Sequence, residues 1–450
     1  MSHEIILNGK HESKPSLLAK IYIWSIVLHP LLFFDFAHEE LIGIGGNISK
    51  ILELIVVICL FFSLIFYRTY SIILNPQYST VYWVYTFYAI WVAFFGYFYG
   101  YYEFNNNIEY VNQGFFNLAI IRPFFEYIIL IFYYFYFVVL AVHFLSSNKT
   151  INYFFKVFLF LFYSHLLLGF LDQISTIYFE FDLIPISLSR YTPTSWRFHG
   201  LAGEPRDAFV FLIFGIAMIY LYNFWKKQNK IKLLLPVTIS IIALLMTASV
   251  SGMVGVIIST GLISAYQLRT FKLKNIFFAV LFSLIVLISV YLNFVYFSRL
   301  GEVLNSLPAL YYGLKEGNIP DGVIGQMPNI YPVFSRFNEV IELNLLPTIF
   351  GTGVGTESVV NVNMLGGGDL TVNPQSQIIR LFYSAGIVGT LLYIISFYYP
   401  VYKISKIYNT KIFIYILLFL LGANLGHRSI AIFIFLGVFM AVFKQLSKKP

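Results

Sequence analysis

Charged residues are scarce in this sequence. They make up 11% of its 450 residues, whereas soluble globular domains carry about 25%. Hydrophobic residues make up 59%, and the mean hydropathy is +0.77. This composition excludes an ordinary soluble multidomain enzyme and is typical of a polytopic membrane protein. Because lipid replaces water around a membrane bundle, we expect residues 1–450 to form a single integral membrane domain.

Cysteine is almost absent, and so are the usual metal-binding and nucleotide-binding patterns. The one cysteine, Cys59, lies in an apolar run and cannot form a disulfide within the chain. The eight histidines show neither HExxH nor paired Cys/His spacing, so we expect no metal site and no cofactor. The net charge of +8 comes with lysines in short segments between apolar runs. That placement indicates membrane topology, and we expect no nucleic-acid partner.

Long apolar runs, by contrast, are abundant. A membrane-spanning helix needs about 20 apolar residues. The run 412–443 would reach about 48 Å as one helix, and it is interrupted at Asn424 and Gly426-His427-Arg428, so we expect two helices there. The sequence therefore predicts an all-α protein with about twelve transmembrane helices. The other expected spans are 17–36, 48–66, 81–102, 124–145, 154–174, 208–224, 233–248, 253–268, 276–297 and 378–401.

The lysines indicate the orientation of these spans, because cytoplasmic loops are enriched in basic residues. When the spans are counted alternately from an inside N-terminus, only Lys50 and Lys315 fall outside. We therefore expect both termini in the cytoplasm. Two long segments then face outward, Asp182–Asp207 and Ser298–Gln377, the second between spans nine and ten.

The arginines are distributed in the opposite way. On the same topology only Arg68 and Arg269 lie inside, which the positive-inside rule does not explain. Arginine differs from lysine in its rigid fork of donors, which matches phosphate and carboxylate groups. This difference favours a requirement for guanidinium on the outer side. The eight outer arginines are Arg122, Arg190, Arg197, Arg206, Arg299, Arg336, Arg380 and Arg428.

Two interpretations of the outer arginines remain open. Arginines at helix ends often extend to lipid headgroups, or pair with nearby acids such as Glu204 and Glu339. Alternatively, they line an outward-facing pocket for an anionic, lipid-borne group, most plausibly a pyrophosphate. The glycines of Gly351-Thr-Gly-Val-Gly355 also allow two interpretations, a phosphate-binding loop or a plain turn. The plain turn is the commoner of the two in long loops.

Four stretches of the sequence, in this order, resemble the O-antigen polymerase and O-antigen ligase superfamily over residues 190–400. They are Arg197-Phe-His-Gly200-Leu-Ala-Gly-Glu204-Pro205; Thr247-Ala-Ser-Val-Ser-Gly252; Arg336 with Leu346-Pro347 and Gly351-Thr-Gly-Val-Gly355; and Gln375-Ser-Gln-Ile-Ile-Arg380 with Gly386-Ile-Val-Gly389. The first five expected spans match the family only in hydropathy.

This resemblance implies a GT-C-like glycosyltransferase of the bacterial inner membrane, with its active site facing the periplasm. The enzyme would polymerise undecaprenyl-pyrophosphate-linked oligosaccharide repeat units into O-antigen or a related surface polysaccharide, without metal or cofactor. The implied partners are the lipid-linked oligosaccharide and membrane lipids, with a chain-length regulator and a flippase as further candidates. The candidate catalytic residues are Arg197 and Arg336, which lie in the family-like stretches, Arg299, which stands where a span meets the long outer segment, and Glu204. The candidate substrate-binding residues are Arg122, Arg206, Arg380, His427 and Arg428.

Two alternatives to the polymerase stay open. The ligases carry a His-Asn pair eleven residues before the position of Gly386, where this chain has Gln375-Ser376. Glutamine cannot accept a proton as imidazole does, so this departure favours the polymerase and makes Glu204 the candidate base. The second alternative is a transporter or flippase for lipid-linked sugars. Transporters tend to have paired halves and interrupted helices, and paired halves are not visible in this sequence.

Overall fold

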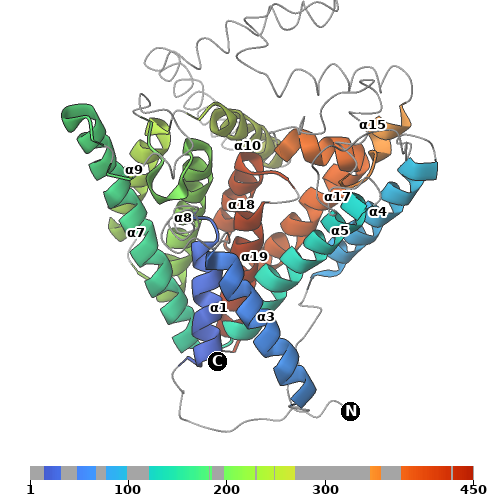
Figure 1. Ribbon diagram of the computed structural model, residues 1–450, viewed down its shortest axis with the longest axis horizontal. Helices are drawn as coiled ribbons and strands as arrows, with labels where there is room; N and C mark the ends of the chain where they lie inside the picture. Colours follow the sequence, from blue (N-terminus) through green and yellow to red (C-terminus); the bar gives the residue numbers. More distant parts are fainter. Residues whose placement is uncertain are drawn as a thin grey trace, which may run out of the picture. The chain divides into compact units, whose positions relative to one another are not determined.

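The computed structural model describes residues 15–31, 48–66, 78–98, 121–181, 183–184, 197–228, 231–247, 249–268, 345–355, 377–426 and 429–448. Within these ranges all regular secondary structure is helical (Figure 1), which confirms the all-α fold. The helices are α1 (Leu17–Leu28), α3 (Ile48–Phe66), α4 (Thr80–Phe98), α5 (Ile121–Tyr134), the π-helical segment η2 (Phe135–Val139), α6 (Leu140–Phe144), α7 (Asn148–Phe179), the 3-10 turn η4 (Gly200–Ala202), α8 (Pro205–Lys226), α9 (Ile231–Met246), α10 (Val250–Leu268), α15 (Leu346–Phe350), α17 (Gln377–Ile407), α18 (Ile412–Ala423) and α19 (Ile430–Leu446).

The apolar helices confirm a polytopic membrane protein. Those long and apolar enough to cross a bilayer, among the described residues, are Ile48–Phe66, Phe124–Phe144, Asn148–Phe179, Pro205–Lys226 and Ser384–Ile407. Shorter apolar helices cover Leu17–Leu28, Thr80–Phe94, Leu233–Met246, Ile412–Ala423 and Ile430–Leu446. The ninth expected span, 276–297, lies outside the described residues. The total of twelve spans, the GT-C-like arrangement and the orientation therefore stay predictions.

Helix boundaries follow local sequence signals. The run 412–443 is divided as expected, since α18 ends at Ala423 and α19 begins at Ile430. In the Ser-rich stretch that follows Met246, the last residue of α9, α10 begins at Val250, and the Ser249 hydroxyl accepts a hydrogen bond from the Gly252 N–H. Pro205 stands at the first position of α8, where a missing N–H costs nothing. The helix therefore already includes the last three residues of the expected outer segment 182–207.

The chain divides into two compact units, each treated separately below. The first contains the described residues of Met1–Leu74, Phe137–Ala243 and Ile434–Pro450, and the second those of Asn75–Tyr136 and Leu244–Phe433.

Phenylalanine rings form much of the core of the first unit. Phe154, Phe158 and Phe162 repeat every four residues along α7, and successive ring centroids lie 6.1 and 6.0 Å apart. They pack on α8, where Phe214 lies edge-on to Phe158 at 5.3 Å. Gly215 of α8 makes room for the Phe162 ring, because a Cβ at that position would overlap it. The α7–α8 pair is thus a well-packed base for the segment that joins the two helices.

The second unit relies on small residues where its helices approach each other. Gly255 of α10 lies against the backbone of Ala423, and Gly422 of α18 lies against Ser259. The Ser259 hydroxyl also donates to the Phe419 carbonyl oxygen at 3.0 Å. Such glycine and serine contacts are the usual means of close helix packing in membranes, where the hydrophobic effect does not drive association.

Candidate functional site

Four of the predicted site residues have described side chains. Arg197, Glu204 and Arg206 belong to the first unit, and Arg380 belongs to the second. Arg122 is the second residue of α5, but its side chain lies outside the described part of the structure. Further predicted residues that lie outside the described ranges are Arg299, Arg336, His427 and Arg428. Their roles stay predictions.

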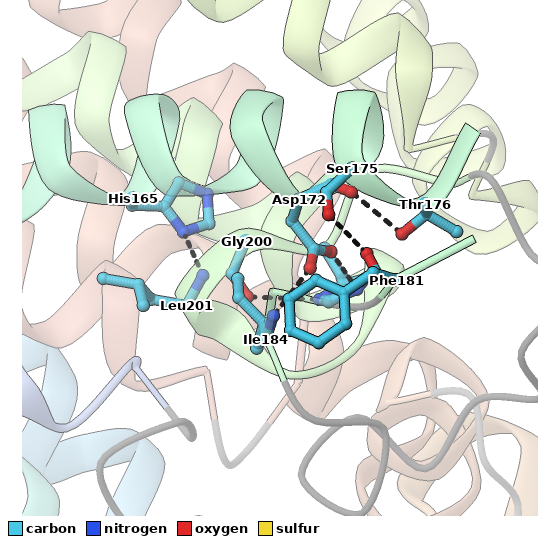
Figure 2. Close-up of polar contacts among 9 residues, drawn as sticks. His165, Asp172, Ser175, Thr176, Phe181, Ile184, Gly200 and Leu201 are labelled. Atoms are coloured by element: carbon cyan, nitrogen blue, oxygen red, sulfur yellow. Dashed lines mark hydrogen bonds and ion pairs between the residues drawn. The ribbon is translucent and has the colours of Figure 1, made fainter. Parts of the chain in front are cut away.

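The family-like segment that begins at Arg197 is anchored on α7 by Asp172. One carboxylate oxygen of Asp172 accepts the Ile184 N–H at 2.7 Å, and the other lies 3.2 Å from Nε2 of His199. Figure 2 shows these contacts below the C-terminal turns of α7. Asp172 is 4% exposed, so this carboxylate is buried and needs the two partners that it has.

A second anchor lies two helical turns earlier on α7. The Leu201 N–H donates to Nδ1 of His165 at 3.0 Å (Figure 2). Because Nδ1 accepts, the proton of a neutral His165 ring is on Nε2, and Nε2 has no hydrogen-bond partner among the described residues. The ring lies edge-on to Phe198 and Phe211, with centroids 5.4 and 5.0 Å away.

Two glycines allow this close approach. A Cβ on Gly169 of α7 would come within 2.5 Å of the buried Phe198 ring. Gly200 has φ of +48°, and a Cβ there would lie 2.8 Å from the His165 ring and 2.9 Å from the His165 carbonyl oxygen. The glycine of the family-like Arg-Phe-His-Gly sequence is therefore explained by backbone conformation and by contact with α7.

Both nitrogens of the His199 ring face oxygen acceptors. Nε2 faces Asp172, and Nδ1 lies 3.2 Å from the Gly200 carbonyl oxygen. The ring can donate to both only when it carries both protons. His199 is thus placed to hold the segment, with both ring nitrogens directed at oxygen atoms.

The three predicted residues of this segment differ in their surroundings. Arg197 is half-buried and directly precedes the buried Phe198. Glu204 is the N-cap residue of α8, although its side chain makes no capping hydrogen bond. Arg206 is 45% exposed, and its Nε lies 3.4 Å from Asp207. For Arg206 the local ion pair is the observed contact, and an exposed pair of this kind contributes little to stability.

In the second unit, the glycine-rich segment 351–355 lies against a break in α17. The break is at Gly386, with φ +62° and ψ −169°, a conformation that is essentially restricted to glycine. A Cβ on Gly386 would lie 2.4 Å from the Gly351 nitrogen, and a Cβ on Gly351 would lie 2.3 Å from the Ser384 carbonyl oxygen. Two family-like stretches therefore meet here, and their glycines permit backbone-to-backbone contact.

Hydrogen bonds stabilise the contact between the segment 351–355 and α17. The Gly353 N–H donates to the Ser384 carbonyl oxygen at 2.9 Å, which satisfies an acceptor released by the helix break. The Tyr88 hydroxyl of α4 lies 2.7 Å from the Phe350 carbonyl oxygen and 3.1 Å from that of Ala385. The glycines of this segment thus serve a tight turn against α17, and no phosphate is needed to explain them.

Arg380 lies on α17, before the break, and is 8% exposed. A side chain extended to lipid headgroups would lie at the protein surface. Burial therefore excludes the headgroup interpretation for this arginine. The role of Arg380 in substrate binding stays a prediction.

Sequence reasoning missed the residues that hold the first segment. His165, Gly169 and Asp172 stand at positions i, i+4 and i+7 of one expected span and so share one helix face. Polar residues on one face of an apolar span are a signal for a buried partner. A further pair links the residue that follows α1 to α3, since Nδ1 of His29 lies 2.5 Å from Oε1 of the buried Glu53.

Comparison of the chain with known protein families, with curated proteins and with solved structures found no match.

Proposed function

We propose that the protein is a membrane glycosyltransferase that polymerises undecaprenyl-pyrophosphate-linked oligosaccharide repeats on the outer face of the bacterial inner membrane. In this reaction a sugar hydroxyl of one repeat attacks the anomeric carbon of another. The bond between that carbon and the pyrophosphate oxygen breaks, the hydroxyl proton is released, and undecaprenyl pyrophosphate leaves. The product is a longer lipid-linked glycan, used for O-antigen or a related surface polysaccharide.

The observation that carries this proposal is the separation of arginine from lysine. Eight of ten arginines fall on the expected outer side, where only Lys50 and Lys315 accompany them. The described arginines support a selective role for some of the eight. Arg206 has a local acidic neighbour and is exposed, whereas Arg380 is buried and Arg197 belongs to an anchored segment.

The chemistry of the departing group explains why guanidinium would be selected. Negative charge grows on the pyrophosphate as the sugar leaves, and fixed donors stabilise such charge without reorganising. Arg197 meets the requirement of a fixed position, because Phe198 and His199 next to it are held on α7. Glu204, in the same segment, remains the candidate base for the acceptor hydroxyl, while the nitrogens of His199 are occupied.

A transporter of lipid-linked sugars is the second candidate, and the break in α17 favours it. Interrupted helices in transporters expose backbone groups that bind substrate or ions. Here, however, the Ser384 carbonyl oxygen accepts from Gly353 of the same chain, and the space beside Gly386 is filled by Gly351. A break that is filled by the protein itself is weaker support for transport than an open one.

Purified protein supplied with lipid-linked repeats alone tests the proposal. We expect a ladder of longer lipid-linked glycans, resolved by gel electrophoresis after release of the glycan. Product that forms only when lipid A-core is added would identify a ligase. Movement of lipid-linked sugar across vesicles without lengthening would identify a transporter. Either result overturns the polymerase.

The orientation has its own test. A reporter enzyme that is active only outside the cytoplasm should be active when fused after Gly317 and inactive when fused after Lys227. The reason is the placement of lysines on one side of the expected spans. The reverse pattern would contradict the orientation and would place the arginines on the wrong face for this reaction.

A further inference from the structure

We propose that Asp172 is a positioning residue for Arg197: the Asp172 carboxylate fixes the outer segment on α7, so that the Arg197 guanidinium meets the departing pyrophosphate in one orientation. This inference rests on the proposed function and adds a residue to it that the family resemblance does not assign. Asp172 itself touches no substrate in this scheme.

One carboxylate joins two distant points of the chain. Asp172 accepts from the backbone N–H of Ile184 and pairs with His199, at 2.7 and 3.2 Å. Ile184 precedes Arg197 in the sequence, and His199 stands two residues after it. Asp172 therefore ties a residue before Arg197 and a residue after it to one turn of α7.

Contacts of the residues that follow Arg197 convert this tie into a fixed position. Phe198 is fully buried against Gly169, and the Leu201 N–H is held by His165. The backbone from Phe198 to Leu201 therefore has three separate attachments to α7. Arg197 is joined directly to this backbone and is itself half-buried. Rigid support of this kind is what a catalytic donor needs in order to act without reorganisation.

Two substitutions at Asp172 distinguish the loss of its hydrogen bonds from the loss of its negative charge. In Asp172→Asn, the side-chain oxygen can still accept from Ile184, and the amide can donate to a neutral His199. Both ties are then kept. In Asp172→Ala both are lost, and the His199 ring keeps only its contact with Gly200. A positioning role thus predicts a large loss of polymer formation in the alanine variant and a small loss in the asparagine variant.

The rate of polymer formation provides the first measurement. Asp172→Ala should lower kcat by about tenfold or more with little change in KM, because a misplacement of about 1 Å can cost about 100-fold in rate. Asp172→Asn should stay within a few-fold of the unchanged protein. Glu180→Gln is the matched control: it removes one acidic charge from the exposed end of the same helix and should leave kcat unchanged.

A double-mutant cycle tests whether Asp172 acts through Arg197. If it does, Asp172→Ala should have little further effect in an Arg197→Lys background, because the lost interaction is shared. If the two losses multiply, Asp172 acts elsewhere and the proposal is overturned.

His199→Ala removes the same ion pair by changing the more exposed of its two residues. It should lower the rate in the same way, so the proposal can still be tested if Asp172→Ala fails to fold. An asparagine variant as defective as alanine also overturns the proposal.

A labelling experiment tests the tie without activity. In a Cys59→Ser background, Arg197→Cys should react slowly with a membrane-impermeant maleimide, and Asp172→Ala should speed that reaction several-fold. Unchanged labelling overturns the tie itself. Absence of polymer from the unchanged protein overturns the proposed function and the catalytic part of this inference, while faster labelling would still establish the tie.

Discussion

Two non-helical segments of this protein lie against long helices, and they are held by different means. The segment that contains Arg197 is held on α7 by side chains, namely the Asp172 carboxylate and the His165 imidazole. The segment 351–355 is held on α17 by its own backbone, through Gly351 and Gly353. Both segments belong to the stretches that resemble the polymerase and ligase family.

This difference predicts how each segment tolerates change. Side-chain hydrogen bonds can be replaced by isosteric groups with the right donors and acceptors. A backbone contact made possible by two glycines has no such substitute, since any side chain at Gly351 or Gly386 overlaps backbone atoms. Isosteric substitution at Asp172 or His165 should therefore have graded effects on the α7 segment, whereas any side chain at Gly351 or Gly386 should disrupt the α17 segment abruptly.

Gly386→Ala should have the largest effect. It combines a backbone conformation that disfavours side chains with overlap at 2.4 Å, and each of the two costs about 1–3 kcal/mol. We expect loss of most folded protein from detergent extracts, measured by size-exclusion chromatography. Gly261→Ala is the control, because a Cβ there meets nothing within 4 Å. Equal stability of the two variants would show that the α17 break is as adaptable as the α7 segment.

Arg197→Lys should have the next largest effect. It should lower activity without lowering the amount of folded protein. Lysine keeps the charge but lacks the rigid fork of donors, and loss of one fixed donor typically costs about 10²–10³ in rate. We expect that loss in polymer formation, with the amount of protein in the membrane unchanged. Arg299→Lys and Arg336→Lys should behave similarly.

Arg190→Lys is the control for this series, because Arg190 lies outside the family-like stretches. If all four lysine variants polymerise normally, charge alone suffices and the headgroup interpretation holds for these arginines. If Arg197→Lys only lowers the amount of protein, Arg197 supports the fold of its segment.

Tyr88→Phe should have the smallest effect and shows how far side chains contribute to the α17 contact. The change removes a hydroxyl that lies 2.7 Å from the Phe350 carbonyl oxygen, and one such hydrogen bond contributes about 1 kcal/mol. We expect a small drop in melting temperature by fluorescence-detected thermal denaturation. Tyr163→Phe is the control, because this side chain on α7 is 45% exposed, and it should lower the melting temperature less. A drop as large as that of Gly386→Ala would mean that side chains hold this segment too.

The helices were largely predictable from the sequence because their signals are local. The span expected at 48–66 matches α3 residue for residue, and the split in 412–443 is observed. The helix break near Thr247 follows from the capping Ser249. The start of α7 was placed too late, since Ser147 and Thr150 form a capping box before the apolar run.

The candidate site was less predictable. The sequence marked Arg197 and the glycines at 200, 351 and 386 through the family resemblance, but their physical roles were not readable from it. A plain turn was the favoured interpretation for 351–355, and the contact with Gly386 supports it and adds the reason. Asp172 was overlooked because one acid in an apolar run has many possible partners.

By itself, the sequence determined that the protein lies in a membrane, where several of its helices begin or end, and that arginine and lysine are separated along the chain. Hydropathy, capping and charge are properties of neighbouring residues, so no fold is needed to read them. Only the tertiary structure decided that Asp172 meets His199 and Ile184, and that Gly351 meets Gly386. Helical spacing shows which residues share a face, but the partner of that face depends on how distant segments pack.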